Sequence, residues 1–283
     1  MATDESVSLR EMTTADIPAG LSLCRAARWN QTDRDWRRFL TVAPHGALVA
    51  EAQGRVVGTV ATLPYGSFAW ISMVLVDPAA RGHGVGTMLL ERGLELIPHG
   101  VTPRLDATPA GEVLYRKLGF AGEYRIQRWY RVEATTQQRD GVRALGHEDW
   151  LAIADMDRRA FGESRIELLR GLAADAPEYA RVVPGDGGVR GYMFGRHGHV
   201  REHLGPIVAQ DAQAATMLLH SCLAAHPDRP VFVDALDDQH AFVTALEAAG
   251  FAVERPFLRM HRGPLTSPGD PTLVYAIAGP ELG

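Results

Sequence analysis

Residues 74–90 read VLVDPAARGHGVGTMLL. An apolar strand ends at Asp77-Pro78, a turn follows with glycines at 82, 84 and 86, and an apolar helix begins directly after it. Glycine has no side chain, so it lets backbone N–H groups approach an anion closely. The first turn of a helix adds unpaired N–H donors and a partial positive charge. The segment therefore predicts a site for a phosphate or pyrophosphate group.

Two common phosphate-binding loops do not fit this segment. A P-loop requires Gly-Lys followed by Ser or Thr, and that sequence is absent here. A dinucleotide-binding loop requires G-x-G-x-x-G after the first strand of its domain. Here the third glycine comes one residue early, and the loop follows about the fourth expected strand.

The pattern R-G-x-G-x-G, preceded by V-x-V-D-P, resembles the acyl-CoA-binding motif of the GNAT superfamily of N-acetyltransferases. The resemblance implies that acetyl-CoA is the donor and that loop amides bind the coenzyme A pyrophosphate. It also implies that the preceding strand splays from its neighbour and pairs with the pantetheine arm. The positions concerned are Val74, Leu75, Val76, Arg81, Gly82, His83, Gly84, Val85, Gly86 and Thr87.

The resemblance continues into residues 115–120, YRKLGF. Tyr115 matches the tyrosine that protonates the departing thiolate when an amine attacks the thioester. The alternative is a ring packed between helix and sheet with its hydroxyl at the surface. Asp106 and Glu51 are conceivable general bases, although each is also a candidate for local hydrogen bonds at a strand end. No cysteine or serine has the surroundings of a nucleophile, so we expect direct attack in a ternary complex.

The family's acceptor site lies at the junction of its first two helices. The corresponding positions here are Trp29, Asn30, Gln31 and Trp36. Apolar rings with a few amides are typical of a small-molecule pocket, and the expected acceptor is a small-molecule amine. The alternative is a turn between helices with both tryptophans in the core.

The pattern of elements restarts after a polar segment, residues 134–139, which we interpret as a linker. The tetrad TMLL recurs at residues 87–90 and 216–219, and Gly-Phe recurs at 119–120 and 250–251. We therefore predict an α/β (α+β layered) fold with two tandem GNAT-like domains, residues 1–134 and 140–283, each a mixed central sheet flanked by helices. Residues 120–124 and 126–132 are expected to form a hairpin that closes the first domain, and a second hairpin is expected after Phe251.

The second domain is predicted to be a degenerate copy. The loop glycines fall on Asp211, Gln213 and Ala215, and Tyr115 falls on Leu246. An aspartate at a pyrophosphate would add like charge. This half is expected to stabilise the first or to complete the acceptor site.

Several basic side chains of the second half could in principle bind a metal ion or contact the substrate. His197, His199 and His203 have the parity of one strand face, but we expect no metal site. Arg196, His203 and Arg259 are candidates for reaching an acidic group on the substrate.

The composition excludes several classes of protein. Of 283 residues, 46% are hydrophobic and 22% are charged, as in a soluble globular protein. The net charge of −5 contains no block of like charge, so no nucleic-acid partner is expected. No apolar run reaches the ~18 residues of a membrane span, and residues 1–8 do not resemble a signal peptide.

We therefore expect a cytoplasmic protein with no membrane partner, in which Cys24 and Cys222 are buried thiols. It is expected to be a monomer, as a pseudo-dimer of domains, or a homodimer. The alternative function is that of a non-catalytic, acyl-CoA-binding regulatory protein.

Overall fold

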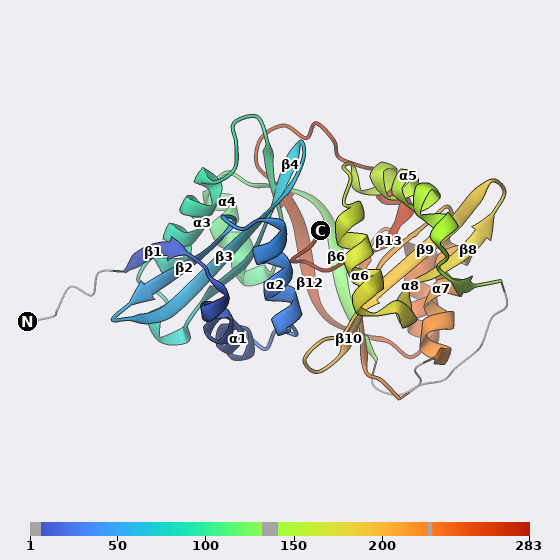
Figure 1. Ribbon diagram of the computed structural model, residues 1–283, viewed down its shortest axis with the longest axis horizontal. Coiled ribbons are helices and arrows are strands. Elements are labelled where there is room, and N and C mark those ends of the chain that lie inside the picture. The colour runs from blue at the N-terminus through green and yellow to red at the C-terminus, as the bar shows by residue number, and fades with distance from the viewer. Residues whose placement is uncertain (1–6, 132–140, 226–227) are drawn as a thin grey trace, which may run out of the picture. The chain divides into compact units, whose positions relative to one another are not determined.

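The computed structural model describes residues 7–131, 141–225 and 228–283 (Figure 1). They form two compact units, one of residues up to Leu105 together with Leu282, and one of residues 106–281 together with Gly283. Each unit combines a sheet with helices on its faces, which confirms the predicted fold class.

The first unit contains a sheet in the order β1-β2-β3-β4-β5. All pairings are antiparallel except that of β4 with β5, which is parallel. Helices α1 and α2 lie on one face and α3 on the other (Figure 1). The elements are β1 Ser8–Glu11, α1 Ile17–Ala26, α2 Asp33–Val42, β2 Ala47–Ala52, β3 Arg55–Tyr65, β4 Phe68–Val76, α3 Val85–Glu95 and β5 Thr102–Ala107, whose last two residues count with the second unit.

Helix α3 lies very close to the sheet, and this fixes the position of the loop that precedes it. Leu89 and Leu90 are fully buried on its inner side. Gly58 of β3 permits the approach, because a Cβ at that position would lie only 2.7 Å from Cδ1 of Leu89. The glycine loop of residues 81–84 is therefore held between two well-packed elements.

The second unit contains a sheet in the order β12-β6-β11-β13-β10-β9-β8-β7. Helices α5 and α6 lie on one face, with α7 and α8 on the other (Figure 1). The elements are α4 Pro109–Lys117, β6 Ala121–Arg131, β7 Arg143–Ala144, α5 Trp150–Phe161, α6 Ile166–Asp175, β8 Arg181–Gly185, β9 Gly188–Arg196, β10 Glu202–Ala209, α7 Ala212–Ala225, β11 Val231–Leu236, α8 His240–Ala248, β12 Ala252–His261 and β13 Val274–Ala276.

The two predicted hairpins are wrong. Residues 121–131 form one uninterrupted strand, β6, which pairs antiparallel with β11 on one side and β12 on the other. Strand β12 likewise pairs with β6 and not with a strand that follows it. Strand β12 pairs with β6 on both sides of residues 123–124, and β11 pairs with residues 126–131, so the strand passes Arg125 without a turn.

This exchange of partners moves the boundary between compact units away from the expected linker. The last strand of the first repeat lies inside the sheet of the second, so the units divide between residues 105 and 106. The domain limits 1–134 and 140–283 describe the sequence repeat and stay a prediction. The linker, residues 134–139, lies outside the described residues.

A further repeated feature went unnoticed in the sequence. Arg10 and Asp16 form a two-pronged ion pair with both distances at 2.8 Å, and Arg143 and Asp149, each 133 positions later, form the same pair at 2.7 Å. Both aspartates also accept from a backbone N–H three residues before them, which caps a helical turn. The arginines hold the pKa of each carboxyl below its usual range.

These two aspartates should stabilise the fold above the pKa of an unfolded aspartate, about 4. We expect Asp16→Asn or Asp149→Asn to lower the free energy of unfolding by about 1–2 kcal/mol at pH 7, because each change removes a cap and an ion pair. The deficit should shrink as the pH falls below about 4 towards the folded-state pKa, since wild type then protonates too. Urea unfolding at several pH values measures this.

The control is Asp155→Asn, which removes only an exposed pair with Arg159. It should cost no more than about 0.5 kcal/mol. A deficit at Asp16 that stays constant down to pH 2 would contradict the role of its ionised form.

Candidate functional site

Strand β4 parts from β5 after only three residues. Residues 68–70 pair in parallel with residues 102–104, and the pairing of the two strands ends there. Residues 71–76 continue to pair with β3 on the other side, up to Val76 opposite Gly58. Within the part of the chain that the structure describes, the β5-facing edge of residues 74–76 thus has no strand partner. Such an edge can bind an extended chain through its backbone.

A bulge lies where β4 leaves β5. Met73 has a φ of +53°, although it is buried and is not glycine. Its carbonyl accepts a hydrogen bond of 2.7 Å from the hydroxyl of Thr59, which holds this conformation in place. A bulge redirects the backbone groups of the residues beside it. Sequence reasoning missed Met73, because methionine gives no indication of a left-handed backbone.

The glycine loop is open where an anion would have to approach. Gly82 and Gly84 have φ values of +81° and +80°, and a Cβ at either position would meet nothing within 4 Å. Residues 81–84 are exposed, and Gly84 caps the start of α3. The side chain of Val85 is buried, so only its backbone can contribute to a site. This open cradle of amides at a helix N-terminus fits a pyrophosphate.

Hydrogen bonds fix the loop to the end of β4. Asp77 accepts from the backbone N–H of Ala79 at 2.9 Å, and Nε of Arg81 donates to the carbonyl of Val76 at 3.1 Å. The Arg81 side chain is exposed beyond that bond, so its cationic end can meet an anion in the loop. The predicted positions from Val74 to Thr87 therefore form one continuous strand, loop and helix start in the first unit.

Tyr115 lies on α4, in the second unit. Its ring packs 5.9 Å from that of Phe120, and burial raises the pKa of its hydroxyl to about 12. Among the described residues that hydroxyl makes no hydrogen bond, whereas four other tyrosine hydroxyls do: Tyr65, Tyr124, Tyr179 and Tyr192. Thr108 caps α4 by accepting from Gly111 at 3.2 Å, which gives it a structural role.

The two conceivable bases are both paired with arginine. Asp106 is completely buried, and its two oxygens accept from Arg259, both at 2.9 Å. Glu51 accepts from Arg10 at 2.9 Å. A carboxylate held by an arginine is a weak base, so the structure gives neither residue clear support as the general base.

The predicted acceptor residues are divided between core and turn. Trp36 is fully buried in α2, where it packs against Gly20 of α1, so it belongs to the core of the first unit. Residues 29–31 form the turn between α1 and α2. Arg25 fastens that turn by donating to the carbonyls of Trp29 and Gln31 at 2.9 and 2.6 Å.

In the second unit, the place that corresponds to the splayed edge is filled by the chain itself. Strands β10 and β11 pair in parallel over residues 202–204 and 231–233 and then part. Strand β13 enters between them and pairs antiparallel with both. The side-chain amide of Gln239 fixes the segment that leads into β13. It donates to the carbonyls of residues 271, 272 and 274, at 3.0–3.1 Å.

The segment of the second unit that corresponds to the glycine loop is also occupied, in this case by an ion pair. Asp211 accepts two hydrogen bonds from Arg190, at 2.7 and 2.9 Å. The filled gap between β10 and β11 and the acidic loop both support the prediction that this half is a degenerate copy.

The three histidines do not share a strand face, contrary to the prediction. Strand β9 ends at Arg196 and β10 begins at Glu202, so His197 and His199 lie in the connection between them. Among the described residues no group of three or more His, Cys, Asp or Glu is arranged to hold a metal ion.

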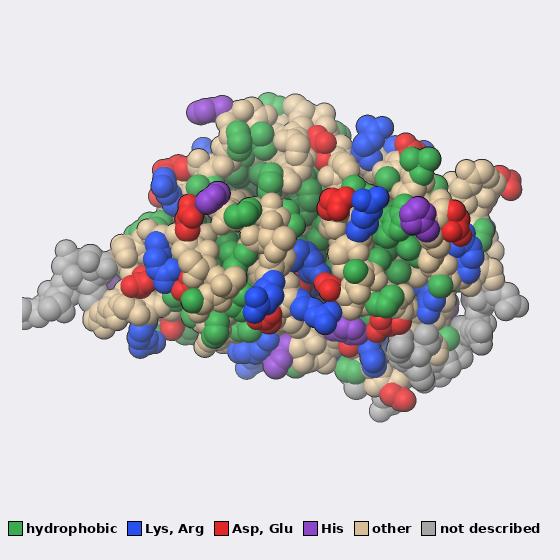
Figure 2. Space-filling view, viewed as in Figure 1, with side chains coloured by type: hydrophobic (Ala, Val, Ile, Leu, Met, Phe, Trp, Pro, Cys, Tyr) green, Lys and Arg blue, Asp and Glu red, His purple; other side chains and the backbone are tan. Residues whose placement is uncertain are grey.

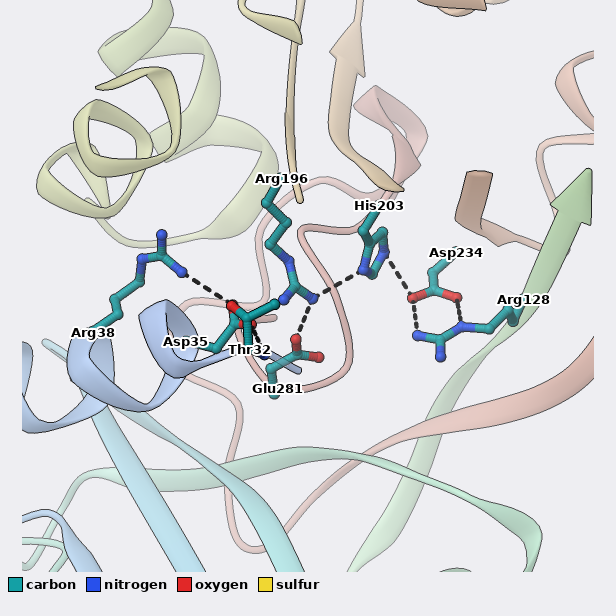
Figure 3. Close-up of polar contacts among 8 residues, drawn as sticks. All are labelled: Thr32, Asp35, Arg38, Arg128, Arg196, His203, Asp234 and Glu281. Atoms are coloured by element: carbon teal, nitrogen blue, oxygen red, sulfur yellow. Dashed lines mark hydrogen bonds and ion pairs between the residues drawn. The ribbon is translucent and has the colours of Figure 1, made fainter. Parts of the chain in front are cut away.

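His203 instead lies in a buried row of charged groups (Figure 3). Its Nε2 lies 3.0 Å from Asp234, while Arg196 donates to its Nδ1 at 2.9 Å and also to Glu281. Since Nδ1 accepts, the imidazole is neutral, and burial lowers its pKa accordingly. Arg196, His203 and Arg259 thus all have internal partners, and none is held ready for a substrate.

On the face shown in Figure 2, acidic and basic side chains are interspersed. No helix among the described residues is both long and apolar enough to cross a membrane.

Comparison with known proteins gives matches to both halves of the chain. Residues 43–121 and residues 153–276 each match a family described as an acetyltransferase (GNAT) domain. The chain is 24% identical over 251 residues to the uncharacterised N-acetyltransferase YitH of Bacillus subtilis (strain 168), covering 88% of each protein.

Two solved structures share the fold. A candidate acetyltransferase from Pyrococcus horikoshii superposes with a TM-score of 0.85 at 24% identity, over 100% of this chain and 98% of that one. A tandem GNAT protein from the clavulanic acid biosynthesis pathway superposes with a TM-score of 0.64 at 17% identity, over 92% and 100% of the two chains.

The glycine loop of the first half is open, whereas β13 fills the gap between β10 and β11 in the second half. We therefore predict a single acetyl-CoA site per chain. We expect Gly84→Glu to weaken that binding at least about 100-fold, because a carboxylate near the pyrophosphate costs on the order of 3–4 kcal/mol. Isothermal titration calorimetry with acetyl-CoA measures both the affinity and the stoichiometry.

The matched control is Gly100→Glu, since Gly100 has a φ of +85° and equally open surroundings. It carries the same backbone strain and the same added charge away from the loop, so binding should persist. Two sites per chain would overturn our interpretation of the second half, and unchanged binding by Gly84→Glu would overturn the loop assignment.

Proposed function

Because the chain belongs to the GNAT superfamily of acetyltransferases, with two such domains in tandem, we propose that it transfers an acetyl group from acetyl-CoA to the amine of a small-molecule acceptor. One observation carries the proposal. The unpaired edge of residues 74–76 runs directly into the open loop of residues 81–84, whereas the corresponding splay of the second half is filled by β13. Among the described residues, an open edge and loop that could hold the donor occur in the first half alone.

The chain's own groups would hold acetyl-CoA along this strand and loop. Acetyl-CoA supplies the acetyl group as an activated thioester. Backbone amides from Gly82 to Thr87 bind its pyrophosphate, with the guanidinium of Arg81 beside them. The free edge of residues 74–76 pairs with the amide groups of the pantetheine arm. Backbone groups redirected by the bulge at Met73 lie at the end of this edge, where they can orient the thioester carbonyl.

Tyr115 is the proposed proton donor to the departing thiolate. A pKa of about 12 keeps its hydroxyl protonated throughout the range in which amines are acetylated. The hydroxyl is not engaged by any described residue, so donating its proton breaks no structural hydrogen bond.

The amine attacks the thioester directly, without a covalent enzyme intermediate. Cys24 and Cys222 are both buried, and burial raises the pKa of Cys222 to about 12, so this thiol does not ionise at neutral pH. A ternary complex of protein, donor and acceptor is therefore the expected kinetic route.

Replacing Tyr115 by phenylalanine tests the proton donor. We expect Tyr115→Phe to lower kcat by about 10²–10⁴-fold, because general acid catalysis contributes about that much. Its affinity for acetyl-CoA should stay near wild type, since the ring remains. Steady-state transfer to an amine, with calorimetry of the donor, separates the two effects.

Tyr275→Phe is the matched control, because the Tyr275 hydroxyl also makes no hydrogen bond among the described residues and lies on β13. It should keep full activity. Full turnover by Tyr115→Phe would show that another group, or water, donates the proton.

A further inference from the structure

The free edge of β4 becomes more deeply buried with distance from the glycine loop. Val74 and Val76, nearest the loop, are partly exposed, whereas Ser72 and Met73 are buried. At Trp70, two positions before Ser72, β4 is paired with β5. The gap beside β4 is therefore open at the loop and closed at Trp70. Only about 7 Å of strand separates Ser72 from the closed end.

Large side chains build the closed end of this gap. Trp70 is fully buried, and the guanidinium of Arg104, the residue paired with it on β5, lies 5.8 Å from its ring centre. The same guanidinium lies 4.8 Å from the ring centre of Phe68. A cation stacked on aromatic rings is attracted to their faces, so it holds them in place. Backbone pairing and this stack together block the strand direction beyond Trp70.

Ser72 and Trp70 point to the face of the sheet on which α1 and α2 lie. A Cβ at Gly93 of α3 would lie 3.1 Å from Cγ2 of Val60, so Val60 of β3 faces α3. Side chains alternate along a strand, so Ala61 faces the opposite side, and Ser72 is its partner on β4. Trp70 lies two positions from Ser72 and shares its face. Both side chains therefore flank the end of the gap on one side of the sheet.

The hydroxyl of Ser72 is the feature of this gap that points to a ligand. Ser72 is only 7% exposed, and its Oγ makes no hydrogen bond with any described residue. By contrast, the buried hydroxyls of Thr59 and Thr62 donate to the carbonyls of Met73 and Gly46, at 2.7 and 3.0 Å. A buried hydroxyl without a partner is unfavourable, so a bound acceptor would relieve its cost. A thioester carbonyl beside Met73 is such an acceptor.

We propose that the end of this gap is an acyl pocket that admits acetyl-CoA and excludes longer acyl groups. The Ser72 hydroxyl donates to the thioester carbonyl, and Trp70 with Arg104 forms the wall that the methyl group faces. A longer chain would have to displace Trp70, and a packed core resists added methylene groups. The pocket rests on the proposed function, in which the donor lies along residues 74–76.

Calorimetry with coenzyme A, acetyl-CoA and hexanoyl-CoA tests the pocket without an acceptor. We expect the full chain to bind acetyl-CoA at least as tightly as coenzyme A, and hexanoyl-CoA at least about tenfold more weakly than acetyl-CoA. Trp70→Leu removes part of the wall and should bring the two acyl-CoA affinities to within about threefold of each other. The control, Trp129→Leu, makes the same change in the core of the second unit and should keep the discrimination.

Ser72 provides a second measurement, which decides the matter even if Trp70→Leu does not fold. Ser72→Ala should weaken acetyl-CoA binding about fivefold and leave coenzyme A, which lacks the carbonyl, unchanged. Since the hydroxyl has no partner among the described residues, the urea midpoint of Ser72→Ala should not fall below that of wild type. Equal losses for the two coenzymes, or a lower midpoint with unchanged binding, would overturn the role of Ser72.

The remaining outcomes separate this pocket from the proposed function. Hexanoyl-CoA binding as tight as acetyl-CoA binding in wild type would overturn the pocket and leave the donor site intact. Discrimination that persists in a folded Trp70→Leu would show that another residue sets the acyl length. Succinyl-CoA binding tighter than acetyl-CoA would overturn the choice of acetyl and make Arg104 a carboxylate ligand. No binding of any of these coenzymes would overturn the proposed function itself.

Discussion

A strand that leaves its neighbour must have its free backbone groups satisfied by something else, and much of this molecule follows from that constraint. An N–H or C=O that is buried without a partner costs about as much as a lost hydrogen bond. In the first half, β4 leaves β5 after Trp70, and its free edge leads into an open glycine loop. In the second half, β10 and β11 part in the same way, and β13 satisfies both. The first half thus has an open strand edge where the second half has a filled one.

The second half is needed because it supplies both strand partners of β6. That strand belongs to the first repeat in sequence, yet both of its neighbours, β11 and β12, come from the second. Removal of the second repeat would leave an eleven-residue strand, with Trp129 and Ile126 buried on its two faces, without any ladder. The second repeat can therefore persist for structural reasons alone.

Structural features that are specified by adjacent residues could be predicted from the sequence. Features that depend on contacts between distant residues could not. The glycine spacing of residues 82–86 and the following helix were read correctly, because a loop between strand and helix is specified by adjacent residues. The strand partners of β6 were not, since nothing near Arg125 indicates that its neighbours lie about a hundred residues away. The bulge at Met73 depends on the Thr59 hydroxyl across the strand pair. The position of Trp36 in the core was one of two alternatives that its sequence context leaves open.

The ion pairs illustrate the same limit. Asp106 and Arg259 are separated by 153 positions, and Arg128 and Asp234 by 106. Asp106 was a conceivable base and Arg259 a candidate for substrate binding, and only the fold reveals that the two pair with each other.

The strand β13 has a consequence for how the two halves respond to their surroundings. A segment tethered to its own groove is present there at a high effective concentration, of the order of millimolar for a short flexible tether. The gap between β10 and β11 is therefore filled at any concentration of ligand in solution. If the first half binds acetyl-CoA as proposed, free ligand at a hundred times its Kd would stabilise that half by about 2.7 kcal/mol. On that proposal, depletion of coenzyme would lower the stability of the first half and leave that of the second half unchanged.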